Sequence, residues 1–363
     1  MSKDSKWRKV LFRGGSARSA VVLAVIAVAA FMLVPSAIAQ LNEKGAALTS
    51  APNSFSVASS KLVATCIAGD NPYIPAYDPV NHDMYIPNYF SGNVSVMDST
   101  CHLVGTVTTN GTPTHAAFDP ANNKVYVSDL TGVVYVIQGL KLVATISVGQ
   151  SGVYGQDTAL VWDPAASMML LAGGGGTNTV YGIRGTTVVG SVTVYSGPQG
   201  LCYDPYANTI LVVSGGYPGS QSVSILSAHH PLTAPTIATV SITGAGSDPR
   251  ECAYDPANHF DYVDNANGAD GVWVLHGNNG SVVGVVYTGY GNLGIAWDQS
   301  TLRMYVADYG HVTTLHGLTI VKTITLPDPN YLGGATYDEF NDRMYVTESG
   351  PIGVFTNQVY VLS

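Results

Sequence analysis

Charged side chains are scarce in this chain of 363 residues, and the positive sign is the scarcer of the two. Asp, Glu, Lys and Arg make up 11% of the residues, and 15 Lys and Arg stand against 24 Asp and Glu, so the formal net charge is −9. Beyond the N-terminal segment, the basic residues form no stripe along the chain. Because proteins that bind nucleic acids neutralise phosphates with clustered Lys and Arg, the composition predicts no nucleic-acid partner.

Signatures of catalysis and metal binding are also missing. The chain has no zinc pattern, phosphate-binding loop or nucleophile elbow. Residues 173–176 are all Gly, but they follow a strand-like segment and open no helix, which indicates a loop. The pair His229 and His230 has no carboxylate or Cys nearby in its segment, so a solvated loop is favoured over a metal site. We therefore expect no catalytic residue, no metal and no cofactor.

In place of such motifs, the chain has seven aromatic residues that are each followed at once by Asp. Successive Asp residues stand roughly 40 to 50 positions apart. A repeat of about 40 residues that reads as short strands is typical of a β-propeller blade. The sequence therefore predicts an all-β, seven-bladed β-propeller. The pairs are Tyr77–Asp78, Phe118–Asp119, Trp162–Asp163, Tyr203–Asp204, Tyr254–Asp255, Trp297–Asp298 and Tyr337–Asp338.

The residues that follow each pair keep a fixed register. Pro follows the Asp in five copies, and a Tyr or Leu stands seven positions after the Asp in every copy. No insertion falls between these positions, so the Asp-Pro segment is expected to form a tight turn between two strands. Two more strand-like segments follow, such as Val133–Ile137 and Leu142–Ile146. Each blade is therefore predicted to have four antiparallel strands.

The two ends of the repeat region predict how the ring closes. The chain stops at Ser363, directly after a third strand, so the last blade lacks its fourth strand. The segment Lys61–Ile67 nearly repeats Lys141–Ile146, which is a fourth strand. We expect this N-terminal strand to complete the last blade, because an unpaired strand edge invites aggregation. The propeller is thus predicted to span residues 61–363.

Three segments carry a resemblance to a known family. Residues 344–348, 304–308 and 125–129 read MYVTE, MYVAD and VYVSD. They resemble the YVTN β-propeller repeat family, which includes archaeal surface-layer-like proteins and bacterial periplasmic propellers. The resemblance spans about residues 61–363, although Leu170 and Leu211 replace the Tyr in blades three and four. Members of the family are mostly non-enzymatic, so the resemblance implies a binding or surface-scaffold role.

The N-terminal segment predicts export. Residues 1–18 are basic, an apolar run covers residues 20–38, and Ala37 and Ala39 form an Ala-x-Ala site. This pattern is typical of a signal peptide over residues 1–39, followed by a linker over residues 40–60. An uncleaved membrane anchor is the alternative, because the apolar run approaches the ~20 residues that span a bilayer. Both interpretations place the propeller outside the cytoplasm, at the cell surface or beyond it.

In an exported protein, Asn residues in sequons can be glycosylated and cysteines can form disulfides. Sequons occur at Asn93, Asn110 and Asn279, where glycosylation is plausible in an exported protein. Export also permits disulfides. Aligning equivalent strands places Cys66 and Cys101 roughly 20 Å apart in height, beyond the ~7 Å between Cα atoms that a bridge spans. Cys202 and Cys252 are level, but alternation points them to different faces, so we expect free buried thiols and keep this bridge as the alternative.

The strongest argument for a site is geometric. Propellers bind ligands at the mouth of the central channel, which is lined by the loops that enter each innermost strand and by the loops between second and third strands. The strongly polar residues four and five positions before the repeat Asp are His115, Gln199, Arg250 and Glu251. Asp129, Asp308 and Glu348 stand ten positions after their repeat Asp, on the same face. One interpretation is that this set binds a cation, a sugar or a partner. The other, which we favour, is that these groups only cap loops and hold channel water.

Three functions follow from these observations. The leading one is a binding or surface-scaffold module with a protein or glycan partner at the cell surface, contacting a membrane only through the N-terminal segment. The second is a lactonase- or lyase-like propeller enzyme with a divalent metal at the channel mouth, which requires convergent carboxylates. The third is a structural component of a surface-layer lattice. Metal analysis of the purified protein separates the second, and imaging of cell envelopes separates the third.

Overall fold

The computed structural model describes residues 60–148, 158–174, 176–195, 197–215, 221–242, 248–266, 271–291, 293–328, 330–350 and 356–363. By its internal contacts the chain divides into Met1–Phe55 and Ser56–Ser363, and every described residue belongs to the second unit. The expected signal or anchor segment and all but the last residue of the expected linker lie outside the described residues. No helix in the described part of the chain is suited to crossing a membrane.

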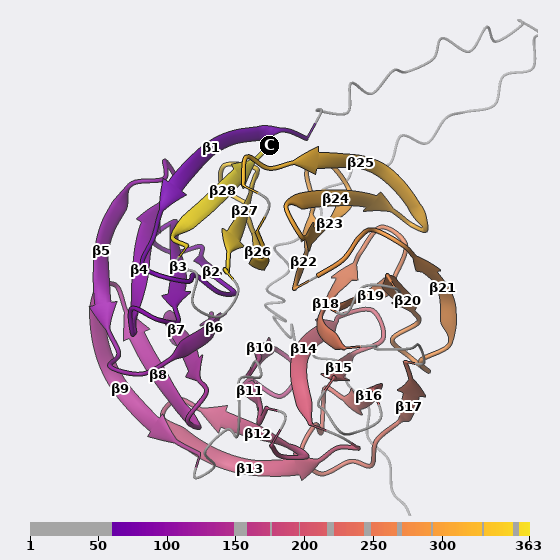
Figure 1. The fold of residues 1–363 in the computed structure, drawn as a ribbon. Coiled ribbons are helices and arrows are strands. Elements are labelled where there is room, and N and C mark those ends of the chain that lie inside the picture. Colours follow the sequence, from indigo (N-terminus) through magenta and orange to yellow (C-terminus); the bar gives the residue numbers. More distant parts are fainter. Residues whose placement is uncertain are drawn as a thin grey trace, which may run out of the picture. The chain divides into compact units, whose positions relative to one another are not determined.

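Seven four-stranded antiparallel sheets surround a common axis, which confirms the predicted all-β, seven-bladed propeller (Figure 1). The chain enters each blade at the innermost strand and moves outward. Blades 1 to 3 consist of β2 (Ala76–Asp78), β3 (Asp83–Asn88), β4 (Asn93–Asp98) and β5 (Leu103–Thr108); β6 (Pro113–Asp119), β7 (Lys124–Asp129), β8 (Val133–Gln138) and β9 (Lys141–Ser147); and β10 (Leu160–Asp163), β11 (Met168–Ala172), β12 (Thr179–Arg184) and β13 (Thr187–Thr193).

The remaining blades repeat the same order. Blades 4 to 6 consist of β14 (Pro198–Asp204), β15 (Thr209–Ser214), β16 (Ser222–Ser227) and β17 (Ala238–Ser241); β18 (Pro249–Asp255), β19 (Phe260–Asn265), β20 (Val272–Leu275) and β21 (Val282–Val286); and β22 (Gly294–Asp298), β23 (Arg303–Asp308), β24 (His311–His316) and β25 (Thr319–Thr325). Blade 7 consists of β26 (Leu332–Asp338), β27 (Arg343–Glu348), β28 (Gln358–Leu362) and β1 (Leu62–Ile67).

The ring closes as the sequence predicts. Strand β1 pairs antiparallel with β28, and Cys66 lies opposite Val359 in the register. The pairing extends to the backbone of Lys61 and Ser363, which exchange two hydrogen bonds. The last blade is therefore built from both ends of the propeller, and neither end leaves an unpaired edge at β28.

Each repeat Asp holds the turn between the first two strands of its blade. All seven are buried, and in each the Oδ1 atom accepts a hydrogen bond of 2.7–3.0 Å from the backbone N–H two residues later. An Asx turn of this kind needs a short acceptor side chain at one fixed position. This requirement explains why Asp recurs without exception while the residue after it varies.

The Tyr that stands seven positions after the Asp connects several blades to the next. Tyr126 of blade 2 is fully buried, and its hydroxyl donates to the carbonyl of Gly185 in the outer turn of blade 3 at 2.7 Å. The Nδ2 atom of Asn122 donates to the same hydroxyl at 2.9 Å. Tyr85 and Tyr262 make the equivalent bonds to Gly139 and Gly317 of the following blades. The repeat thus encodes contacts between blades as well as the turn within each blade.

This tyrosine bond changes where the repeat changes. Tyr305 of blade 6 contacts Ser60, directly before β1, at 2.6 Å, because the last blade has no outer turn of the usual kind. Blades 3 and 4 have Leu170 and Leu211 instead, and both are fully buried in apolar clusters between blades. The apolar core of the propeller lies between neighbouring blades in this way around the ring.

Cys202 and Cys252 form a disulfide, which corrects the expectation of free thiols. Their Cα atoms are 5.6 Å apart, and both side chains belong to the cluster between blades 4 and 5. Alternation along the strands predicts that the two residues point to opposite faces of their blades, and the structure agrees. In a ring, however, one face of a blade packs against the opposite face of the next blade, so this offset brings the two cysteines together.

Cys66 and Cys101 are also bridged, which shows that the height argument against this pair was wrong. Their Cα atoms are 5.6 Å apart. Figure 1 shows the reason: the outermost strands β1, β5 and β9 curve along the rim of the ring instead of standing parallel to its axis. The end of β1 therefore reaches the turn that precedes β5 in blade 1, where Cys101 has a positive φ of 74°. The twist of each blade was absent from the sequence argument.

The bond between blades predicts the cost of removing one hydroxyl. Tyr126→Phe should lower the free energy of unfolding by about 1–2 kcal/mol, because the Gly185 carbonyl loses its donor and the Asn122 amide loses its acceptor. Chemical denaturation of the purified propeller measures this difference. Tyr195→Phe is the matched control, since Tyr195 is 62% exposed. Equal stability of the two variants would contradict the structural role of the hydroxyl.

Candidate functional site

The two faces of the ring carry different segments. The mouth face carries the loops that enter each innermost strand and the loops between second and third strands. The turn face carries the Asp turns and the turns between third and fourth strands. His115 and Glu251 lie toward the mouth-face ends of β6 and β18, the innermost strands of blades 2 and 5.

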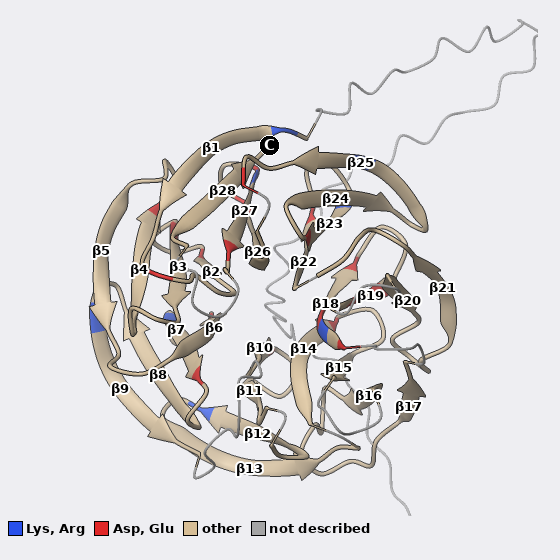
Figure 2. Ribbon diagram, viewed as in Figure 1, with Lys and Arg blue, Asp and Glu red and all other residues tan. Residues whose placement is uncertain are grey.

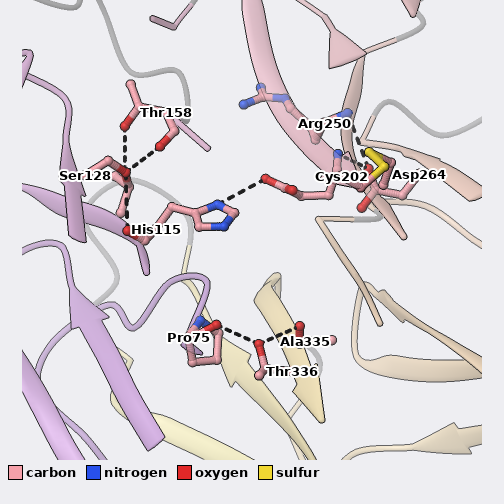
Figure 3. Close-up of polar contacts among 12 residues, drawn as sticks. Pro75, His115, Ser128, Thr158, Cys202, Arg250, Asp264, Ala335 and Thr336 are labelled. Atoms are coloured by element: carbon pink, nitrogen blue, oxygen red, sulfur yellow. Dashed lines mark hydrogen bonds and ion pairs between the residues drawn. A yellow bond between two sulfur atoms is a disulfide. The ribbon is translucent and has the colours of Figure 1, made fainter. Parts of the chain in front are cut away.

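His115 and Glu251 meet across the interior of the ring. Their Nδ1 and Oε1 atoms are 3.6 Å apart, and the two residues are only 7% and 5% exposed. Figure 3 shows His115 pointing away from Ser128 and Thr158 of its own side and toward the strand that carries Arg250. Because blades 2 and 5 lie on opposite sides of a seven-bladed ring, this contact spans the centre of the ring. The contact is an ion pair when His115 is protonated.

Irregularities in the innermost strands aim these side chains. The register shifts between Pro113 and His115 in β6, and between Pro249 and Cys252 in β18. Bulges of this kind redirect a side chain and are common beside functional sites. Blades 4, 6 and 7 have Gly at the equivalent position, and blades 1 and 3 have Ile74 and Ala159. A Cβ on Gly294 would lie 2.5 Å from the Cα of Gly334, so Gly there lets neighbouring strands approach. His115 and Glu251 place polar groups at a level where the other blades have apolar residues or Gly.

Arg250 and Gln199 surround Glu251. The Nη2 atom of Arg250 pairs with Asp248 at 2.7 Å, so its charge is balanced within the same strand segment. Gln199 is fully buried on the neighbouring strand β14. The carboxylate of Asp264 accepts the backbone N–H of Glu251 at 2.7 Å and that of Arg250 at 3.3 Å. Burial raises the pKa of Asp264 well above its usual range.

The three carboxylates expected at the channel mouth accept hydrogen bonds from groups of their own blades. Asp129 accepts from the backbone of Thr131 at 2.6 Å, and Asp308 accepts from Thr313 at 2.7 Å. Glu348 accepts from Tyr360 at 3.0 Å. All three are nearly or fully buried, and burial raises the pKa of Asp308 to about 6 and raises that of Glu348. Among the described residues, no group of three His, Cys, Asp or Glu side chains is arranged to hold a metal ion.

The structure therefore divides the expected site residues into two groups. His115 and Glu251 meet at the centre of the ring, and Arg250 and Gln199 lie beside Glu251 in sequence and on the neighbouring strand. Asp129, Asp308 and Glu348 lie at the ends of the second strands of blades 2, 6 and 7. The three expected glycosylation sites differ in how exposed their Asn side chains are. Asn110 and Asn279 are exposed beside or in turns, while Asn93 is half-buried and its side-chain oxygen accepts from Asn88 at 2.8 Å.

Two acidic residues of β19 were missed by the sequence argument. Asp261 and Asp264 are both fully buried. At the position of Asp261 the other blades have Met, Val or Ile, and at the position of Asp264 they have Pro, Ser, Ala, Val or Thr. Comparing every position of the repeat, instead of only the positions near the channel, would have found both. Blade 5 is thus the polar exception in an apolar ring, and Figure 2 shows both signs of charge on its innermost strand β18.

Asp261 lies beside the repeat Asp of the neighbouring blade. Burial and the carboxylate of Asp204 raise the pKa of Asp261 to about 9. A Cβ on Gly277 would collide with both carboxylates, which places the outer turn of blade 5 directly over them. The arrangement keeps one proton in the interface between blades 4 and 5 at neutral pH.

Comparisons with known proteins agree on the fold. No protein-family model and no curated protein sequence matches the chain. Among solved structures, Kuenenia stuttgartiensis hydrazine synthase superimposes with a TM-score of 0.65 at 16% identity, covering 82% of this chain and 96% of that one. The WD40 β-propeller domain of Doa1 superimposes with a TM-score of 0.64 at 13% identity, covering 84% and 97%. At this identity the similarity shows the propeller architecture alone.

The proton held by Asp261 predicts a pH dependence of stability. The folded protein keeps this proton up to about pH 9, whereas the unfolded chain releases it near ~pH 4. Raising the pH through this window therefore lowers the free energy of unfolding, by at most about 1.4 kcal/mol per pH unit. Asp261→Asn should flatten this slope and stabilise the protein by about 1–3 kcal/mol near pH 8.

Denaturant unfolding of both proteins between about pH 5 and pH 8 measures this effect. Asp70→Asn is the matched control, because Asp70 is exposed and lies outside the interface between blades 4 and 5. If the free energy of unfolding of Asp261→Asn falls with pH as steeply as that of the wild type, Asp261 does not hold the proton.

Proposed function

We propose that the chain is an exported, non-catalytic propeller that binds a partner protein with its mouth face. The observation that carries this proposal is a group of aromatic side chains that the mouth-face loops of blades 6, 7 and 1 present to solvent. Tyr290 and Tyr309 are 53% and 40% exposed, and Phe90 is 40% exposed. Tyrosine and other aromatic residues are enriched at the cores of protein interfaces, where they supply contact area at low entropic cost.

The loops hold these aromatic side chains in defined positions. The rings of Tyr309 and Tyr331 pack edge to face with their centres 5.0 Å apart, and Tyr290 lies 6.4 Å from Tyr331. Gly291 has a φ of +80°, and a Cβ there would lie 3.3 Å from the Tyr331 ring. In blade 1, Tyr89 packs against Tyr73 and Phe90 at 5.6 Å and 4.9 Å. A preorganised aromatic surface loses little freedom on binding, which favours affinity.

The polar groups of the same face support binding over catalysis. Asp129, Asp308 and Glu348 hold loops through the bonds described above, and His115 and Glu251 contact each other below the mouth. These bonded loops and the contact of His115 with Glu251 give the aromatic residues a fixed base. The polar residues thus act as support, and the exposed aromatic residues supply the contact surface.

The sequence supports the cellular side of the proposal. The basic flank, the apolar run and the Ala-x-Ala site at residues 37–39 favour export, and two disulfides suit an oxidising compartment. Membership of the YVTN family is part of the same proposal, and it rests on Tyr-Val pairs such as those at Tyr126, Tyr262 and Tyr305, whose hydroxyls bond to the next blade. Glycans at the exposed Asn110 and Asn279 would be compatible with a cell-surface location.

Binding to cell envelopes tests the proposed surface. Labelled propeller should bind envelopes of the source organism, and Tyr290→Ala with Tyr309→Ala should weaken binding at least about tenfold, as expected for interface anchors. Tyr206→Ala on the turn face is the matched control, because Tyr206 is 67% exposed. Protease treatment of the envelopes should abolish binding, whereas periodate oxidation of glycans should not. Binding that survives protease and is lost with periodate would identify a glycan partner instead.

Export is tested separately on the native protein. Cleavage after Ala39 should give a mature N-terminus at Gln40 in an extracytoplasmic fraction. N-terminal sequencing of protein purified from the source organism measures this. A chain that begins near Met1 in a membrane fraction would support the anchored alternative, and a soluble cytoplasmic protein would contradict export.

A further inference from the structure

An insertion in blade 4 folds over the outer part of blade 3. Residues 228–237 connect β16 to β17, where other blades have short turns. The backbone of Ala234 donates to His230 at 3.0 Å, and Leu232 packs into the apolar cluster between blades 3 and 4. The insertion meets blade 3 where Leu170 replaces the tyrosine, so two departures from the repeat coincide at one place on the turn face.

A cavity of about 210 Å³ lies between the insertion and blade 3. Its apolar part is formed by Met168, Pro231 and Leu232, of which the first two are buried. Its polar part is formed by Arg184, His229 and His230, all three exposed. The volume is below the ~300–1,000 Å³ of pockets for drug-sized molecules, so the cavity suits a small ligand.

Among the described residues that line the cavity, every ionisable group is basic. Arg184 is fixed by a 3.0 Å bond from Nη2 to the carbonyl of Ala166, and its planar fork retains further N–H donors. Asp163, which interacts electrostatically with His229, is fully buried and accepts the backbone N–H groups of Ala165 and Ala166. In a chain with so few cations, three basic groups around an apolar floor form a distinct environment for an anion.

We infer that this cavity is a binding site for a small carboxylate with an apolar body. The guanidinium of Arg184 matches a carboxylate in shape, and the apolar floor accepts an aromatic or branched aliphatic group. This site lies on the turn face and is independent of the partner surface proposed above.

Calorimetric titration of the mature protein with phenylacetate tests the inference, with phenylacetamide as the uncharged ligand of the same shape. Phenylacetate should bind at least about tenfold more tightly than phenylacetamide. Arg184→Gln should weaken phenylacetate about tenfold and leave phenylacetamide unchanged. Arg343→Gln is the matched control, because Arg343 also lies at the turn face and also donates to a backbone carbonyl.

The two histidines give a second readout. The double variant His229→Gln with His230→Gln should weaken phenylacetate and leave phenylacetamide unchanged, because it removes basic groups from the cavity wall. Tyr290→Ala with Tyr309→Ala should bind phenylacetate normally, so failure of the partner surface does not affect this test. No binding of phenylacetate to the folded wild type, or equal binding by Arg184→Gln, would overturn the inference.

Discussion

The hydrogen bond from a buried tyrosine hydroxyl to the outer turn of the next blade is the contact on which the ring depends. Tyr85, Tyr126 and Tyr262 make it to a Gly carbonyl, and Tyr305 makes a related contact with Ser60 at the closing blade. A blade has two apolar faces and is stable only between neighbours, so a bond that fixes one blade to the next also fixes the packing of the core. The Asp turn places the tyrosine correctly, because no residue is inserted between them.

The three remaining pairs of neighbouring blades use other means. The Cys202–Cys252 disulfide joins blades 4 and 5, where Leu211 replaces the tyrosine, and the Cys66–Cys101 disulfide joins blade 7 to the outer turn of blade 1. Between blades 3 and 4 the long insertion covers the site instead. Asp261 and Asp264 are buried in blade 5, and the cavity beside Arg184 lies between blade 3 and the insertion of blade 4. The repeat provides stability, and its departures provide the distinctive chemistry.

The two proposed binding surfaces reflect this division. The mouth face presents aromatic rings that pack against one another, above the contact of His115 with Glu251, which suits a macromolecular partner. The turn face has a small basic cavity, which suits a small anion. Neither surface uses Asp129, Asp308 or Glu348, because burial makes a free carboxylate costly and each of these groups is bonded within its own blade.

The sequence by itself determined the blade number, the strand order, the turn at each Asp and the closure by β1, because these are local patterns repeated at a constant register. It also placed His115 and Glu251 at one level of the channel. Only the tertiary structure decided that these two residues meet, that Asp261 and Asp204 share an interface, and that both pairs of cysteines are bridged. Contacts between blades depend on the twist of each sheet and on which faces meet around a ring, and a single repeat read as a line of residues contains neither.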